Sequence, residues 1–479
     1  MKIWSKKGED IGKGVQEFLC REDILNDETV VFWDIVGSIA HTKALEKAGV
    51  LSAKESKELV TALRNLLLLH KTNKFKLDES LEDVHSNLEA WLTTEVGDLG
   101  KKIHTGRSRN DQAATDLALY SKAGMFSTCT FVAELCNTLL SIPATCNCPM
   151  PGYTHSRKAM ISSVPHWLLA HCEILLNDLG LLLHTIDLID KSPLGAAAGY
   201  GTIVPIDRKM TAKALGFSSP YTNTLAAIGS RGKNTTAILA ALTSVMQTLS
   251  SFSTELILFS GEEFISLPKE YCTGSSIMPH KSNPDCLELI RAKAARLLGL
   301  QTGVAATVLS LPLGYHRDIQ ETKGALMEAF EITVNCISIM DGVVSGIEIN
   351  EKACIDACTD EMCLADVATK MSMGGIPFRD AYRKVKKAKG ELTDPKKNIL
   401  QKKHLGAPGD KAAGKQLKKQ LSLLKSKLEK KQAVFESAIT DLLESPIPLT
   451  RGHRSRRHPA PAHISRKSFP YPRPLCHPS

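Results

Sequence analysis

GSSIMPHKSNPD, residues 274–285, lies between two long segments, 233–261 and 284–308, in which apolar residues recur at the period of an α-helix. Asn283 followed by Pro284 is typical of a helix start, because an Asn side chain caps the first turn and Pro suits the first helical position. Similar helical periodicity recurs at 111–142, 162–190 and 321–345. These segments far exceed the mean helix of about 12 residues in globular proteins. The chain is therefore predicted to be all-α, with an elongated central helix bundle.

Changes of pattern along the chain predict four parts. We expect an N-terminal helical domain over residues 1–105, the long-helix bundle over 106–348, and a C-terminal helical domain over 349–444. The last part, 445–479, holds eight prolines with Arg and His between them. Such a segment cannot bury a core, so we expect it to be a disordered tail.

The net charge of +9 is concentrated near the C-terminus. Residues 445–479 contain six Arg, one Lys and no acid, which leaves 9 − 7 = +2 for the rest of the chain. A lysine-rich stretch from Arg383 to Lys431 is typical of a solvated helix face. A nucleic-acid-binding protein would spread basic residues over its folded face and interleave aromatics, so nucleic acid is not expected as a partner.

Cysteine usage and the absence of long apolar runs predict a cytoplasmic protein. The thirteen cysteines form no CxxC pair, only Cys146-Asn-Cys148 and a loose series of Cys354, Cys358 and Cys363. No His pair at zinc spacing accompanies them, so reduced thiols are expected rather than a metal site. The N-terminus lacks the apolar run of a signal peptide, and no stretch of about 18 apolar residues predicts a membrane span.

The stretch 274–285 also carries groups suited to a carboxylate substrate. A helix N-terminus offers unpaired N–H groups, Lys281 adds a positive charge, and the paired serines supply hydroxyls. The pattern resembles GSSxMPxKxNP, the signature of the fumarase/aspartase superfamily of lyases. That resemblance implies that Ser275 is the base that removes a proton next to a carboxylate, with Lys281 and Asn283 stabilising the charge that develops.

A second motif indicates which family within this superfamily the chain resembles. HTGRSRNDQ, residues 104–112, is similar at every position to the motif of the argininosuccinate lyases. Its two arginines suit a carboxylate clamp, because a guanidinium binds a carboxylate through two parallel hydrogen bonds. The resemblance implies that Ser108, Arg109 and Asn110 bind substrate.

Further segments extend the resemblance over about residues 27–390. PGYTH, residues 151–155, implies that Thr154 contacts substrate and that His155 serves as an acid, paired with Glu288. Other matching positions imply substrate-binding residues: Asp83, Arg231, Tyr315, Gln320 and Lys323.

The resemblance also implies the reaction and the assembly. Members of the family cleave argininosuccinate reversibly to arginine and fumarate in arginine biosynthesis, without a metal or organic cofactor. They assemble as homotetramers in which each active site takes loops from three subunits. Tetramerisation would also cover helices that are too apolar to face water alone.

Two segments depart from the family pattern, and three alternatives therefore stay open. Residues 156–161 lack the family's LQRAQP, and residues 226–232 replace a Ser and two Asp by Gly and Ala. Another fumarate-releasing enzyme, such as an adenylosuccinate lyase, is one alternative. The others are a non-catalytic protein of the lens-crystallin kind and a nucleic-acid-binding role for the basic tail.

Overall fold

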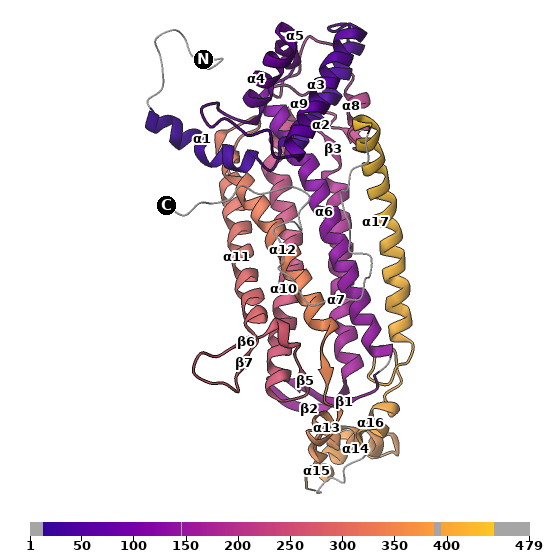
Figure 1. The fold of residues 1–479 in the computed structure, drawn as a ribbon. Helices are drawn as coiled ribbons and strands as arrows, with labels where there is room; N and C mark the ends of the chain where they lie inside the picture. Colours follow the sequence, from indigo (N-terminus) through magenta and orange to yellow (C-terminus); the bar gives the residue numbers. More distant parts are fainter. Residues whose placement is uncertain (1–12, 145, 388–393, 445–479) are drawn as a thin grey trace.

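Five long helices form the body of the molecule (Figure 1). The computed structural model describes residues 13–144, 146–387 and 394–444. The bundle helices run alternately up and down and have apolar faces that pack into one large core. Their bounds are α6 (Arg109–Ser141), α7 (Val164–Ile189), α10 (Arg231–Gly261), α11 (Asp285–Val308) and α12 (Glu321–Ser345). The predicted all-α bundle is confirmed.

The N-terminal helices cover one end of the bundle. Helix α2 is buried along nearly its whole length, and Trp33 within it is fully buried. Helix α3 buries a row of leucines, Leu59, Leu63, Leu66 and Leu67. Its N-cap is Ser52, whose side chain forms a capping box with Glu55. The bounds are α1 (Lys13–Asp27), α2 (Val31–Lys47), α3 (Ala53–Lys71), α4 (Val84–Val96) and α5 (Asp98–Lys101).

The C-terminal residues form a group of short helices at one end of the bundle and one long helix along its outside. Four short helices gather at the opposite end of the bundle (Figure 1): α13 (Glu351–Asp356), α14 (Leu364–Met373), α15 (Phe378–Lys387) and α16 (Pro395–Gln401). Helix α17 (Ala413–Leu443) then runs back along the outside of the bundle and packs against α2, α6 and α7. Phe435 anchors it, because its ring lies 6.0 Å from that of Trp33 and 5.7 Å from that of Phe126. Residues 445–479 lie outside the described residues.

Short strands and two small helices join the long helices. Within the described ranges, β1 and β2 are the only strands that form an extended hairpin; the others pair over two residues, β3 with β4, β5 with β8 and β6 with β7. The remaining bounds are β1 (Pro149–Thr154), β2 (Arg157–Ser163), β3 (Lys191–Ser192), α8 (Arg208–Ala214), β4 (Ser219–Pro220), α9 (Thr224–Gly229), β5 (Ile265–Ser266), β6 (Thr273–Gly274), β7 (Ser282–Asn283) and β8 (Glu348–Ile349). Across the described ranges, no helix combines the length and the apolar character that crossing a bilayer requires.

Candidate active site

The motif 104–112 starts helix α6 and organises the loop beside it. Ser108 is the N-cap: its Oγ accepts a hydrogen bond from the Asn110 N–H (3.2 Å), and its own N–H donates to Asp111 Oδ1 (2.8 Å). The second oxygen of Asp111 accepts from the N–H groups of Gly195 (3.1 Å) and Ala197 (2.8 Å). Asp111 therefore fixes the segment 193–205 against the motif, a positioning role that sequence reasoning missed.

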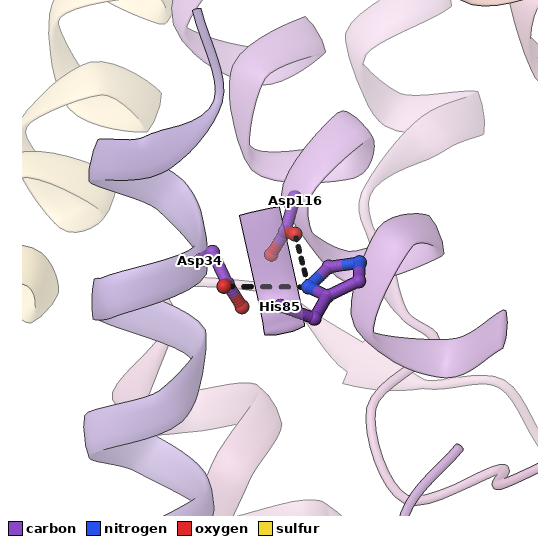
Figure 2. Close-up of side chains that lie close together, drawn as sticks. All are labelled: Asp34, His85 and Asp116. Atoms are coloured by element: carbon purple, nitrogen blue, oxygen red, sulfur yellow. Dashed lines mark ion pairs between the residues drawn. The ribbon is translucent and has the colours of Figure 1, made fainter. Parts of the chain in front are cut away.

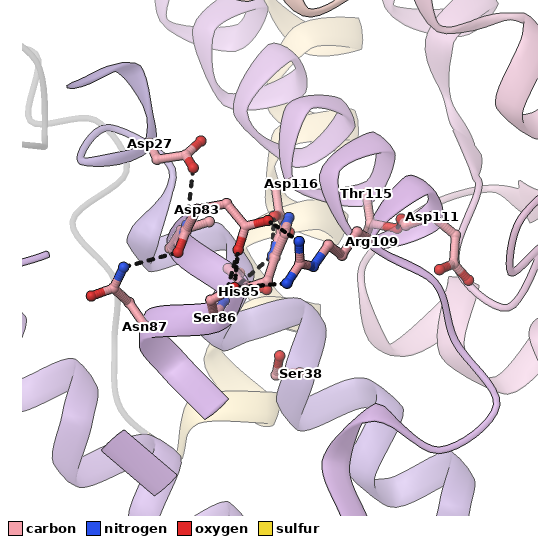
Figure 3. Close-up of polar contacts among 12 residues, drawn as sticks. Asp27, Ser38, Asp83, His85, Ser86, Asn87, Arg109, Asp111, Thr115 and Asp116 are labelled. Carbon is pink, nitrogen blue, oxygen red and sulfur yellow. Dashed lines mark hydrogen bonds and ion pairs between the residues drawn. The ribbon is translucent and has the colours of Figure 1, made fainter. Parts of the chain in front are cut away.

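Arg109 and Asp83, both predicted to bind substrate, contact each other (Figure 3). The Arg109 guanidinium lies 3.3 Å from the Asp83 carboxylate and 2.7 Å from that of Glu82, and it donates to Ser86 Oγ (2.9 Å). Burial opposes the charge on Asp83, but His85 and Arg109 hold the pKa of this carboxyl below its usual range. The Arg109 guanidinium is thus half-buried and held in place by two carboxylates of its own chain.

Lys323 and Gln320 lie at the same end, where α12 meets α1. The Lys323 ammonium forms ion pairs with Asp27 (2.5 Å) and with Asp23, and Gln320 Nε2 donates to the Leu19 carbonyl (3.0 Å). Burial disfavours the charged ammonium, yet the two carboxylates raise the pKa of Lys323. Asp27 also accepts a hydrogen bond from the Val84 N–H (2.9 Å), which connects Lys323 to the start of α4.

Arg231, the first residue of helix α10, belongs to the same group of residues. Burial lowers the pKa of Arg231, and Tyr315, Asp23 and Asp27 are close enough to act against that effect. The neighbouring glycines explain part of the departure from the family pattern at 226–232. A Cβ at Gly232 would lie 2.3 Å from Val308 at the end of α11, and one at Gly229 of α9 would lie 2.7 Å from Leu313 in the loop that follows, so larger residues at either position would clash with these neighbours.

A buried cluster of Asp34, His85 and Asp116 lies beneath these residues (Figure 2). His85 Nδ1 is 3.3 Å from Asp34 and 3.9 Å from Asp116. Burial disfavours the charged ring, but Asp34, Asp83 and Asp116 raise the pKa of His85 to about 10. Burial and the neighbouring Asp34 raise the pKa of Asp116.

The spacing of the three side chains would admit a cation, since their ligand atoms lie within 4.8 Å of one another. A protonated imidazole has no lone pair to offer a metal, however, and the nearby Arg107 adds a second positive charge. We therefore interpret the cluster as an ion-paired support for the site. Other buried polar residues lie close to them along the same helices, Ser38 and His41 in α2 and Gln112 and Thr115 in α6, so no sequence signal sets Asp34 and Asp116 apart.

Ser275 lies at the other end of the bundle, in the loop between β6 and β7. Its Oγ accepts hydrogen bonds from the N–H groups of Met278 (3.1 Å) and Ile277 (3.4 Å), which would stabilise a deprotonated oxygen. The predicted cap at Asn283 is wrong: Pro284 occupies the N-cap position and α11 begins at Asp285. Asn283 belongs instead to β7, where it pairs with Thr273 and donates to the Gly274 carbonyl (3.4 Å). Pairing between β6 and β7 therefore outweighs the local preference of Asn283 for the cap position.

His155 and Thr154 lie at the tip of the β1–β2 hairpin, also at this end. His155 and Ser156 have φ values of 52° and 56°, which is the conformation of a two-residue type I′ turn. The turn exposes His155 to solvent. Glu288 is exposed in the first turn of α11, and within the described part of one chain it forms no ion pair with His155. The sequence gives little sign of this hairpin, because residues 156–163 show little strand-like alternation.

The predicted site residues thus fall into two groups at opposite ends of the bundle (Figure 1). Asp83, Ser108, Arg109, Asn110, Arg231, Tyr315, Gln320 and Lys323 lie around the start of α6 and α12. Thr154, His155, Ser275, Lys281, Asn283 and Glu288 lie around the start of α7 and α11. Helix α11, of 24 residues, separates Asn283 from Tyr315 by about 36 Å at 1.5 Å per residue. One chain alone does not bring the two groups together.

The match to a family model defines the class of protein as a lyase. A family model described as Lyase matches residues 18–299. Solved structures of similar fold include an EDDS lyase, with a TM-score of 0.76 and 23% identity over 87% of this chain and 91% of that one. The class II fumarase of Schistosoma mansoni has a TM-score of 0.65 and 18% identity over 82% and 92% of the two chains.

Sequence relatives specify the family further. The argininosuccinate lyase of Thermotoga neapolitana is 39% identical over 396 residues, which cover 82% of this chain and 99% of the relative. That of Xylella fastidiosa is 37% identical over 414 residues, covering 85% and 93%. The chain belongs to the argininosuccinate lyase family.

Proposed function

We propose that the protein catalyses the reversible elimination of argininosuccinate to arginine and fumarate, in the cytoplasm, within a homotetramer. The observation that carries the proposal is the division of the site residues between opposite ends of one chain. A substrate with a carboxylate-bearing half and a guanidino half needs both sets of site residues at the same time. Copies of the chain packed side by side would supply them, and each copy would contribute to more than one site.

The β6–β7 loop supplies the groups for removing the proton. We assign Ser275 as the base that takes the proton from the carbon beside the substrate carboxylate. The electron pair then moves onto that carboxylate, whose added charge Lys281, Asn283 and backbone N–H groups stabilise. The two N–H donors on Ser275 Oγ support this role, because they lower the cost of carrying negative charge on that oxygen.

The remaining step breaks the carbon–nitrogen bond. As electrons return from the aci-carboxylate to form the double bond of fumarate, the guanidino nitrogen leaves and takes a proton. We assign His155 as the donor, directly or through water, oriented by Glu288 of a neighbouring copy. Arg109, with Ser108 and Asn110, would hold a substrate carboxylate from the opposite end of another copy.

Fumarate absorbance on mixing the purified protein with argininosuccinate tests the substrate, and adenylosuccinate serves as the competing substrate. Ser275→Ala should lower turnover by about 10²–10⁴-fold while the fold and assembly persist, because the half-buried hydroxyl bonds to N–H groups of its own loop and not to the helix bundle. Retention of more than about a tenth of the activity would refute the assignment of the base. Release of fumarate from adenylosuccinate alone would refute the assignment of the substrate.

Mixed assemblies test the shared site. Ser275→Ala and His155→Asn should each be inactive alone. If two chains supply the two groups, co-refolding equal amounts should restore about a quarter of the wild-type rate, because each position is independently intact in about half of the sites. A mixture that stays inactive, while mass measurement confirms mixed assemblies, would show that both groups come from one chain.

A further inference from the structure

A recess lies between helices α6 and α10, near the start of α10 and beside the segment that follows α7. The apolar part of its lining includes Leu117 of α6, Ile189 of α7 and Ile238 of α10. All three are buried, with at most 6% of each residue exposed. The space between the walls measures about 420 Å³ and is partly open to solvent. The recess therefore suits a ligand of a few heavy atoms with a short apolar part.

Two cations line the recess, and within the described ranges neither of them forms an ion pair. Arg231 is the first residue of α10, and its Nε–H group is buried without a hydrogen-bond partner. Lys191 of β3 is exposed, and its ammonium lies 5.9 Å from the centre of the Tyr221 ring. None of the described residues that line the recess is Asp or Glu. The lining thus carries two positive charges and no negative charge.

The carboxylates closest to Arg231 are engaged elsewhere. Asp23, Asp27 and Asp116 act on the charge of Arg231, but none of them lines the recess. Asp23 and Asp27 form ion pairs with Lys323, and Asp116 belongs to the buried cluster around His85. The guanidinium of Arg231 is therefore available to an anion from outside, which would offset the cost of burying its charge.

Neutral donors in the same lining are held in place. Asn234 Nδ2 donates a hydrogen bond to Tyr221 Oη (2.9 Å), which leaves the hydrogen of the Tyr221 hydroxyl for a ligand. The Tyr221 backbone is fixed on both sides, because its N–H donates to the Ser192 carbonyl (3.1 Å) and its carbonyl accepts from Arg208 (2.9 Å). Ser121 of α6, which is 5% exposed, adds a second hydroxyl to the lining.

The sequence beside Arg231 departs from the family pattern at this same place. Residues 226–232 lack the Ser and the two Asp of that pattern and have Gly and Ala instead. Ala227 of this segment lines the recess, and Gly232 directly follows Arg231. The segment has thus lost two carboxylates next to an arginine that remains, and a bound anion would take their place.

We propose that the recess binds a short aliphatic dicarboxylate. One carboxylate would pair with Arg231 and the other with Lys191, so that the two charges of the ligand match the two charges of the lining. The methylene groups of the ligand would contact Leu117 and Ile238, and the Tyr221 hydroxyl would donate to a carboxylate oxygen. An amino acid fits less well, because no carboxylate in the described lining can receive its ammonium group.

A ligand in the recess would also affect the site of the proposed reaction. Arg231 is a predicted substrate-binding residue as well, so the ligand would compete with the substrate for its guanidinium. This consequence rests on the proposed function, whereas binding in the recess does not. The test therefore measures binding without turnover, and its result is independent of whether argininosuccinate is cleaved.

Melting curves of the full chain in rising concentrations of succinate, at constant ionic strength, measure the Kd. Arg109→Gln serves as the background, because Arg109 is predicted to bind a substrate carboxylate. In this background succinate should still raise the melting temperature, whereas succinamide, its uncharged analogue, should not. Adding Lys191→Met should raise the Kd for succinate at least tenfold. Ala118→Leu, which fills the recess and keeps both charges, should do the same.

The chain offers a matched control. Lys233 is exposed on α10, two residues after Arg231, and does not line the recess, so Lys233→Met should change the Kd less than twofold. Loss of all stabilisation in Arg109→Gln alone would show that succinate binds only at the substrate site. Equal effects of Lys191→Met and Lys233→Met would show unspecific attraction by charge. Either result would overturn the proposal. If Ala118→Leu fails to fold, as circular dichroism would reveal, Lys191→Met changes an exposed side chain and still decides the question.

Discussion

The charge on His85 should make the stability of the protein fall at alkaline pH. The ordinary pKa of 6.5 applies to the unfolded chain, and the surrounding carboxylates raise the folded value to about 10. A group whose pKa is raised by folding stabilises the protein fully below pH 6.5 and loses that effect as the pH rises through about 10. The difference between these two pKa values corresponds to a contribution to the free energy of unfolding of at most about 5 kcal/mol.

Replacing His85 by Asn should remove this pH dependence. At pH 6 the variant should be less stable by about 3–5 kcal/mol, because Asp34 loses its partner in a buried site. Between pH 6.5 and 10 the gap between wild type and variant should close, since only the wild type has a charged His85 to lose. Adding Asp34→Asn to the variant should recover part of the loss.

Urea unfolding at pH 6, 7, 8, 9 and 10, at one protein concentration, measures both effects. His184 is exposed on α7, so His184→Asn is a matched control that should follow the wild type at every pH. Parallel curves for wild type and His85→Asn across this range would contradict the assignment of the charge to His85.

Two other predictions concern the C-terminal part of the chain. Phe435→Ala should lower the free energy of unfolding by about 3–5 kcal/mol, because the ring is 1% exposed and packs against two aromatic rings. A loss below about 1 kcal/mol would show that α17 is not anchored there. Deleting residues 446–479 should change the melting temperature by no more than about a degree, because so proline-rich a segment has few side chains that can pack. The deletion leaves Glu444 in place, whose carboxylate pairs with Arg64 (2.7 Å). Calorimetry of both variants gives the values, and a shift of several degrees on truncation would mean that the tail docks on the folded part.

Much of the fold and the family could be predicted from the sequence alone. The helix expected at 321–345 coincides with α12, and that expected at 233–261 begins within two residues of the start of α10. Helical periodicity is a local property, so long amphipathic segments reveal themselves without a tertiary structure. The motifs at 104–112 and 274–285 likewise indicated the family, because each is a continuous run of residues.

Other features depended on contacts between distant residues and required the tertiary structure. The local preference at Asn283 and Pro284 predicted a cap, but pairing with Thr273 placed Asn283 in a strand instead. Asp34, His85 and Asp116 come from three separate helices, and nothing in their neighbouring residues predicts that they meet.

The same holds for the two-ended site. The separation of Ser275 from Arg109 follows from the length and direction of the bundle helices. A local pattern indicates which side chains carry chemistry, whereas the energy that places them relative to one another comes from burying apolar faces that lie far apart along the chain.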